Sequence, residues 1–149
     1  MNDKRSSAAL LRLATFVFLL VLLSAMGLVK ATSLDSFKWQ YRLLIIDVSM
    51  HTDRSALESL LNAHVKDIED RKLRVILYTQ DAIVEAFTNT PLLLEREVVE
   101  NMLANKYSIL VGLDGGIKSF YEPSANTIDI NQVFADIDGM PMRKLERQN

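Results

Sequence analysis

An uninterrupted apolar run, Leu43 to Ile46, is the sequence feature that most constrains the fold. A short continuous run of this kind predicts a β-strand buried on both faces, here over Arg42 to Val48. A second run, Leu73 to Thr79, has the same character. The chain has 149 residues, 49% of them hydrophobic, which suits a single globular domain with a sizeable core.

The segment between these two strands predicts a helix that begins after His51 and continues to about Asp70. Thr52 or Asp53 offers an N-cap, and Ser55 with Glu58 offers a capping box. The apolar residues of the segment recur at helical spacing: Leu57, Leu60, Leu61 and Ile68. A strand, a helix and a second strand in this order favour parallel pairing through a right-handed crossover.

The second half of the chain continues the alternation. Ile83 to Phe87 predicts either a short strand or one helical turn, and Thr90 followed by Pro91 predicts a helix start. Strands are expected at 108–113 and 117–121, joined by a hairpin turn at Asp114-Gly115-Gly116. A last helix, capped by Asp129 and ending before Gly139, has this apolar face: Ile130, Val133, Phe134 and Ile137.

The N-terminus predicts an export segment. Residues 1–12 carry three basic side chains against one acidic one, residues 13–29 carry no charge, and Lys30 and Ala31 follow. This order is typical of a secretory signal peptide, cleaved after Ala31 or near Ala25 to Gly27. Cleavage after Ala31 leaves 13 basic and 18 acidic residues, a formal charge of -5 in place of -2.

Two alternatives remain for the same segment. Seventeen apolar residues lie at the short limit for an uncleaved membrane anchor, since about 20 are usual. The other alternative is a buried core helix. With either a signal peptide or an anchor, the domain after residue 31 is exported, to the periplasm or the extracellular space.

Composition excludes several classes of function. The chain has no cysteine, so it has no thiolate nucleophile, no disulfide and no thiol redox cycle. Two histidines leave little for a histidine-rich metal site, and the negative charge argues against non-specific nucleic-acid binding. We therefore expect no metal, no cofactor and no nucleic-acid partner.

The order of elements predicts an α/β, thioredoxin-like layout: a four-stranded mixed sheet flanked by helices, at residues 34–147, after the signal or anchor at residues 1–31. Three segments sharpen this prediction: Leu34-Asp35-Ser36-Phe37-Lys38-Trp39, Ile109 to Lys118, and Ile137-Asp138-Gly139-Met140-Pro141-Met142-Arg143-Lys144. Together they resemble the thioredoxin-like family called domain of unknown function 4174. The resemblance implies a short exported bacterial protein, related to a domain of sushi-repeat-containing extracellular proteins, and implies no particular reaction.

The chain departs from thioredoxin-like enzymes at two places. Val48 to Asp53 stand where those enzymes carry their reactive thiol, and a serine there has too high a pKa to replace a thiolate. The proline usual before the third strand is missing from residues 105–108.

Four polar residues alternate at the end of the first strand: Asp47, Ser49, His51 and Asp53. If this segment is extended, all four side chains point to one side, at the strand end where open α/β sheets bind ligands. His51 would then serve as base to Ser49, or would bind a divalent metal with Asp47 and Asp53. We favour a structural interpretation. In it Asp53 and Thr52 cap a helix, Ser49 satisfies a turn, and His51 is exposed to solvent.

Two further features have structural interpretations. His64 lies four residues from both Leu60 and Ile68, which predicts a hydrogen-bonded histidine at the edge of the core. The basic tail with Arg143, Lys144 and Arg147 predicts a solvated terminus, with contact to anionic lipid or a partner as the alternative.

Three hypotheses for function follow. The first is an exported, non-redox binding or accessory module, whose partner is a protein or a small ligand of the cell envelope. The second is a thiol-independent enzyme that uses Asp47, Ser49 and His51. The third is a structural accessory held at the membrane through residues 13–29.

Overall fold

A five-stranded mixed sheet forms the centre of the domain in the computed structural model, which describes residues 33–50, 53–123 and 127–148. The strand order is β3-β2-β1-β4-β5. The central strand β1 (Arg42–Asp47) runs parallel to β2 (Leu73–Tyr78) and antiparallel to β4 (Ser108–Val111). The expected mixed α/β architecture is confirmed, and both apolar runs are buried strands.

The edge strand β3 raises the number of strands from the predicted four to five. β5 (Ile117–Tyr121) pairs antiparallel with β4 as expected, and β3 (Ile83–Glu85) adds an antiparallel edge beside β2. Of the two alternatives for this segment, the strand is the right one. Ile83 and Glu85 are buried while Val84 between them is half-buried, and this alternation suits pairing with a strand.

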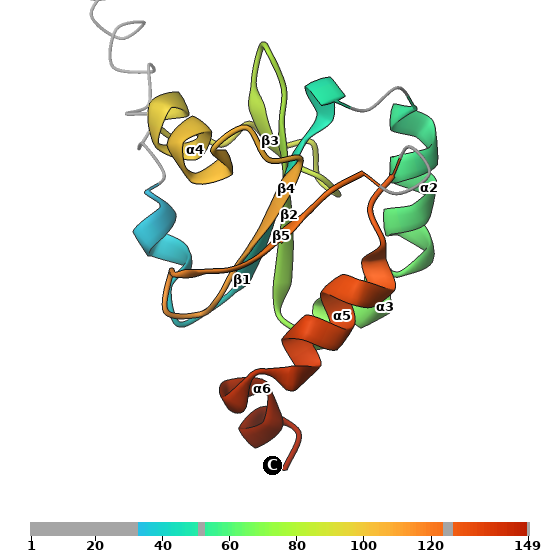
Figure 1. Cartoon of the computed structure of the whole chain (residues 1–149), viewed down its shortest axis with the longest axis vertical. Helices are drawn as coiled ribbons and strands as arrows, with labels where there is room; N and C mark the ends of the chain where they lie inside the picture. Colours follow the sequence, from blue (N-terminus) through green and yellow to red (C-terminus); the bar gives the residue numbers. More distant parts are fainter. Residues whose placement is uncertain (1–32, 51–52, 124–126, 149) are drawn as a thin grey trace, which may run out of the picture. The chain divides into compact units, whose positions relative to one another are not determined.

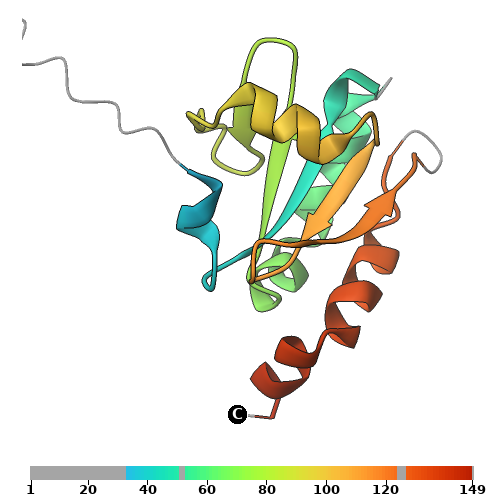
Figure 2. The same ribbon diagram turned by 60° about the vertical axis from the view of Figure 1, so that its left-hand side comes forward.

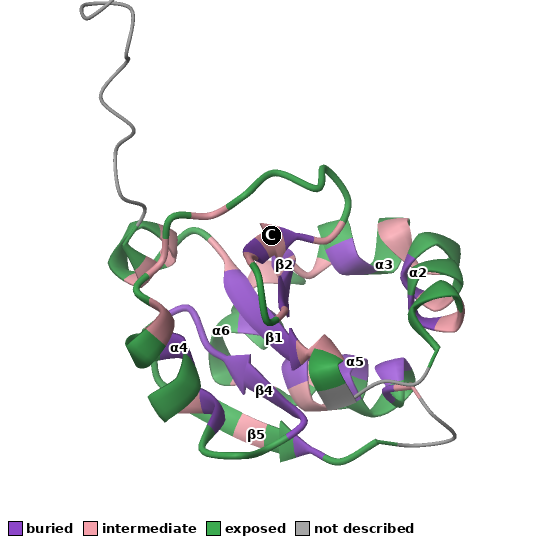
Figure 3. Cartoon of the chain, turned by 90° about the horizontal axis from the view of Figure 1, so that it is seen from above, coloured by how far each residue is buried: buried purple, intermediate pink, exposed green. Residues whose placement is uncertain are grey.

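Helices cover both faces of the sheet (Figures 1 and 3). One face carries α2 (Arg54–Ala63), α3 (Val65–Asp70) and α5 (Ile130–Gly139), which pack on Leu44, Ile46 and their neighbours. The opposite face carries α4 (Arg96–Leu103) and the short 3₁₀ helix η1 (Leu34–Phe37), which pack on Leu43 and Ile45. Figure 2 shows α5 continuing into α6 (Pro141–Glu146).

The helix predicted between the first two strands is broken into two. His64 leaves helical geometry, with φ of -115° and ψ of 17°, and so separates α2 from α3. Asp53 is the N-cap, because its carboxylate accepts a hydrogen bond from the amide of Ala56 at 3.0 Å. The predicted capping box does not form: Ser55 donates to Asp53, and Glu58 pairs with Arg54.

The helix predicted to start at Thr90 and Pro91 begins five residues later, at Arg96. Pro91 instead forms an isolated bridge to Val84 in β3, and the amide of Leu92 donates to the carbonyl of Ile83 at 2.7 Å. Pairing with the edge strand therefore keeps this segment extended and overrides the local helix-start signal.

The predicted hairpin turn and the cap of the last helix are confirmed, although β4 ends at Val111, two residues earlier than predicted. The β4–β5 hairpin turns at Asp114, and Gly115 takes a φ of +80° that favours glycine. Asp129 caps α5 by accepting from the amides of Asn131 and Gln132. Gly139 is the last residue of that helix, which therefore ends one residue later than predicted.

The predicted export segment lies outside the described residues, and so does His51. Within residues 33–50, 53–123 and 127–148, no helix is long and apolar enough to cross a membrane.

Candidate functional site

The strand-end turn, Asp47 to Ser49, is the place where sequence reasoning put its candidate residues. Val48 to Met50 form a 3₁₀ turn directly after β1. One carboxylate oxygen of Asp47 accepts both the amide of Ser49 at 2.9 Å and its hydroxyl at 2.5 Å. The structure thus brings Asp47 and Ser49 together, in a local turn at the surface.

The other predicted polar residues take separate roles. Asp53 caps α2, and the hydrogen bonds from the Ala56 amide and then the Ser55 hydroxyl hold the pKa of Asp53 below its ordinary value. His64 is a half-buried residue at the core edge, as predicted. Its Nδ1 lies 3.4 Å from a carboxylate oxygen of Asp67, and its ring packs edge-on against Phe134. Across the described ranges, no three histidine, aspartate or glutamate residues gather as metal ligands would.

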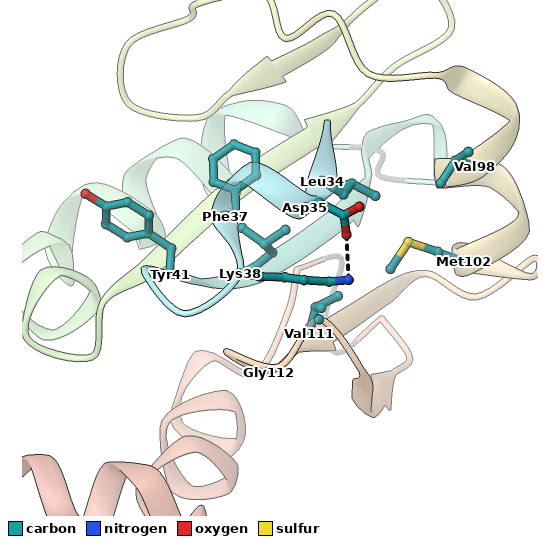
Figure 4. Close-up of a pocket in the computed structure, with 11 residues that line it drawn as sticks. Leu34, Asp35, Phe37, Lys38, Tyr41, Val98, Met102, Val111 and Gly112 are labelled. Atoms are coloured by element: carbon teal, nitrogen blue, oxygen red, sulfur yellow. Dashed lines mark ion pairs between the residues drawn. The ribbon is translucent and has the colours of Figure 1, made fainter. Parts of the chain in front are cut away.

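An apolar groove, here called the η1 groove, lies between η1, α4 and the hairpin (Figure 4). It has a volume of about 190 Å³, and Leu34, Val98 and Met102 are among its lining residues. Lys38 reaches across the opening to Asp35, with 2.5 Å between ammonium and carboxylate. The groove offers apolar contact, and its charged groups at the opening are already paired.

A network of ion pairs holds α6 to the sheet and α5. Arg143 is only 5% exposed. Its guanidinium donates to the carboxylate and the carbonyl of Asp70 and, at 3.2 Å, to Asp138. The prediction of a solvated basic tail is therefore wrong for Arg143, because two carboxylates from elsewhere in the chain surround it, and right for Lys144 and Arg147, which are exposed.

Arg42 is the second buried cation at this end of the sheet and is fully buried. Its Nη1 donates to the carbonyl of Arg71 at 2.8 Å and to Glu146 at 3.2 Å, while Nη2 donates to the other carboxylate oxygen of Glu146 at 3.3 Å. Its Nε is buried and has no hydrogen-bond partner among the described residues. A fork of this kind fixes the last helical turn against the start of β1.

A pocket of about 280 Å³, here called the α6 pocket, lies beside Arg42. Leu113, Met140 and Met142 supply apolar walls, together with Pro141 and Gly112. Lys118 lines it too, and its ammonium lies 2.7 Å from the carboxylate of Asp114. A Cβ at Gly112 would lie 2.5 Å from Cε of Lys118, so the glycine lets the lysine chain lie against the strand.

Sequence reasoning missed the α6 pocket. Its signal was present: Arg42 is the first residue of a strand buried on both faces, where an unpaired cation is strongly unfavourable. A charged residue at that position needs a carboxylate partner, but no local spacing rule identifies Glu146, which lies 104 residues away.

Comparison with known families now places the chain. The sequence model of the family described as domain of unknown function (DUF4174) matches residues 33–146, and the chain belongs to this family. The predicted resemblance is thereby confirmed. Searches of curated proteins and of solved structures found no match.

Proposed function

We propose that this protein is an exported, thioredoxin-like module that binds a small ligand or a partner of the cell envelope without thiol chemistry. The strand arrangement supports the fold assignment. Strands β2, β1, β4 and β5 lie in that order, with β1 and β2 parallel and β4 and β5 antiparallel to their neighbours. The parallel first pair and the antiparallel hairpin agree with the sequence prediction of a mixed sheet, and β3 is an addition at its edge.

The α6 pocket is the observation that carries the binding role. Small-molecule sites are concave and mostly apolar, with a few polar groups that fix orientation. The α6 pocket combines thioether and aliphatic walls with the side chains of Arg42 and Lys118. The η1 groove lacks such a buried polar group.

Catalysis at the strand-end turn is the less favoured alternative. The hydroxyl of Ser49 donates to Asp47, and a carboxylate is in general too weak a base to remove the proton of a serine hydroxyl. The role of His51 stays a prediction. Export and possible anchoring through residues 13–29 are likewise part of the proposal and rest on the sequence pattern.

A fragment screen by amide NMR tests where the protein binds. The screen contains neutral, cationic and anionic fragments. We expect every fragment that binds to shift the amide signals of Gly112, Leu113 and Met142 in the α6 pocket. The amide of Ser49 serves as the internal comparison. Binders that cluster at the strand-end turn, or a fragment that is chemically converted, would contradict the proposed function.

A further inference from the structure

The charged side chains that line the α6 pocket already have partners within the chain. Arg42 is fully buried, and its terminal nitrogens donate to Glu146 and to the carbonyl of Arg71. Lys118 and Asp114 both line the pocket and form an ion pair, with 2.7 Å between ammonium and carboxylate. The guanidinium of Arg42 is therefore out of a ligand's reach, whereas Lys118 and Asp114 meet a ligand as a pair whose charges balance.

The hairpin turn supports this ion pair. The other carboxylate oxygen of Asp114 accepts from the amide of Gly116 at 3.0 Å, and the hydrocarbon stem of Lys118 lies against Gly112. The hydrogen bonds from Lys118 and then from Gly116 hold the pKa of Asp114 below its ordinary value, so its carboxylate stays ionised at neutral pH. Both charges therefore persist side by side at the pocket wall.

A charged ligand gains little from such a pair. A carboxylate placed near the ammonium of Lys118 also meets the carboxylate of Asp114, and an ammonium placed near Asp114 also meets Lys118. Because the two groups lie 2.7 Å apart, attraction and repulsion nearly cancel, while the ligand's own charge still loses hydration. An uncharged oxygen avoids this penalty, since the ammonium has three donors and Asp114 uses one.

Apolar side chains form most of the remaining pocket wall. Met140, Pro141 and Met142 come from the junction of α5 and α6, and Leu113 comes from the hairpin. Methionine side chains are flexible and polarisable, so they adapt to hydrocarbon groups of different shape. A volume of about 280 Å³ lies just below the usual range for drug-sized ligands, which begins at about 300 Å³. The pocket therefore suits a compact molecule with a hydrocarbon body.

We propose that the α6 pocket binds a small uncharged molecule with an apolar body and an oxygen acceptor, such as a primary amide, an ester or a ketone. The oxygen accepts a hydrogen bond from the ammonium of Lys118, whose pair with Asp114 stays intact. The hydrocarbon part contacts Leu113, Met140 and Met142. The proposal rests on the proposed binding function and adds its ligand class. A peptide backbone offers the same chemistry, and a free molecule fits the small volume better.

The test compares probes of similar length that differ in charge. Hexanamide, hexanoate and hexylammonium are titrated at neutral pH into the protein isolated after export, and binding is followed by amide NMR. We expect hexanamide to bind at least about fivefold more tightly than either ion, with shifts in the amide signals of Gly112, Leu113 and Met142. Butanamide lacks two methylenes and should bind at least about threefold more weakly than hexanamide. N-acetyl-leucine amide represents a peptide, and tighter binding than that of hexanamide would overturn the assignment to a free molecule.

Two variants of the ion pair should change the preference for charge in opposite directions. Lys118→Met leaves Asp114 unpaired and should strengthen hexylammonium binding at least about threefold. Asp114→Asn leaves Lys118 unpaired, keeps an oxygen for the amide of Gly116, and should strengthen hexanoate binding by a similar factor. The charge-matched controls are Lys144→Met and Glu97→Gln, at exposed positions that do not line the pocket, and they should leave all affinities unchanged.

A second pair of variants tests the apolar wall. Met142→Ala shortens a lining side chain, and Leu145→Ala shortens an exposed side chain of the same helix that does not line the pocket. We expect Met142→Ala to weaken hexanamide binding at least about threefold and Leu145→Ala to leave it unchanged.

Three results would overturn the assignment of ligand class. They are binding of either ion as tight as that of hexanamide, equal effects of Lys118→Met and Lys144→Met, and no hexanamide binding at millimolar concentration. Fragments of other chemistry that still bind in the α6 pocket would then leave the proposed function standing. Binding at the strand-end turn would contradict both proposals.

Discussion

Replacing Arg143 with alanine should destabilise the domain by about 2–3 kcal/mol. Hydrogen bonds to charged groups contribute roughly 1.5–3 kcal/mol each where they are shielded from water. The bond from Arg143 to Asp138 is partly shielded, whereas the carboxylate of Asp70 is mostly exposed and adds little. Asp138 keeps its pair with Arg71 at 2.7 Å, so the substitution leaves no carboxylate stranded.

The effect should depend on pH with a definite sign. Burial alone would raise the pKa of Asp138, but the hydrogen bonds from Arg71 and Arg143 outweigh it, and the pKa lies below its ordinary value of 3.8. A lowered pKa in the folded state means that the stabilisation is complete above 3.8 and is lost as pH falls through the folded-state value. The difference between the wild-type protein and Arg143→Ala should therefore be largest near neutral pH and shrink below pH 3.8.

Equilibrium urea unfolding followed by far-UV circular dichroism measures this difference. Circular dichroism is the better probe, because the single tryptophan, Trp39, is already 67% exposed in the folded protein. The expected loss corresponds to a fall in Tm of about 10 °C. Lys144→Ala is the matched control on the same helix and should stay within about 0.5 kcal/mol of wild type. If Arg143→Ala changed the free energy of unfolding as little as Lys144→Ala does, the stabilising role given to the ion-pair network would be refuted.

Ile45→Ala should cost about 2–5 kcal/mol in urea unfolding, because Ile45 is fully buried in the central strand, and an unchanged midpoint would mean that the strand is misassigned. Asp53→Ala should lower the urea midpoint by removing the cap of α2, whereas Ser49→Ala, in an exposed turn, should change it by less than about 0.5 kcal/mol. Purified protein should neither reduce insulin disulfides nor consume peroxide, because it has no thiol; turnover in a metal-free preparation would defeat this reasoning. N-terminal sequencing of exported protein should begin within residues 25–33, and intact full-length protein in the membrane would favour the anchor instead.

Local signals were sufficient for much of the fold. The apolar run at Leu43 to Ile46 predicted a strand buried on both faces. Asp129 was predicted as a cap, and Asp53 was one of the alternatives for the cap of the first helix, because capping depends on neighbouring amides alone. The predicted start of α4 was wrong because it depends on a contact with a residue distant in the sequence. Pro91 bridges to Val84 in the edge strand, and a partner in another element is invisible to a rule about consecutive residues.

The candidate site shows the same limit more strongly. Arg143 meets Asp70 across 73 positions of sequence, and Arg42 meets Glu146 across 104. Spacing rules treat a basic tail as solvated because most such tails are. Only the folded arrangement, in which α6 returns to the start of β1, shows that Arg42 and Arg143 are both buried.

The two ends of β1 differ in the charged side chains they carry, and this difference argues against an anion site at the usual end of the sheet. Ligands of open α/β sheets usually lie at the carboxyl ends of strands, where helix N-termini offer free amides. Here Asp47 and Asp53 place two carboxylates at that end, and Asp53 already accepts one of the amides that an anion would need. At the opposite end Arg42, Arg143 and Lys72 meet Glu146, and Arg143 also pairs with Asp70 and Asp138, so these cations already have partners within the chain. An anionic ligand is therefore disfavoured at the usual end of the sheet, and the cations at the start of β1 hold α6 in place.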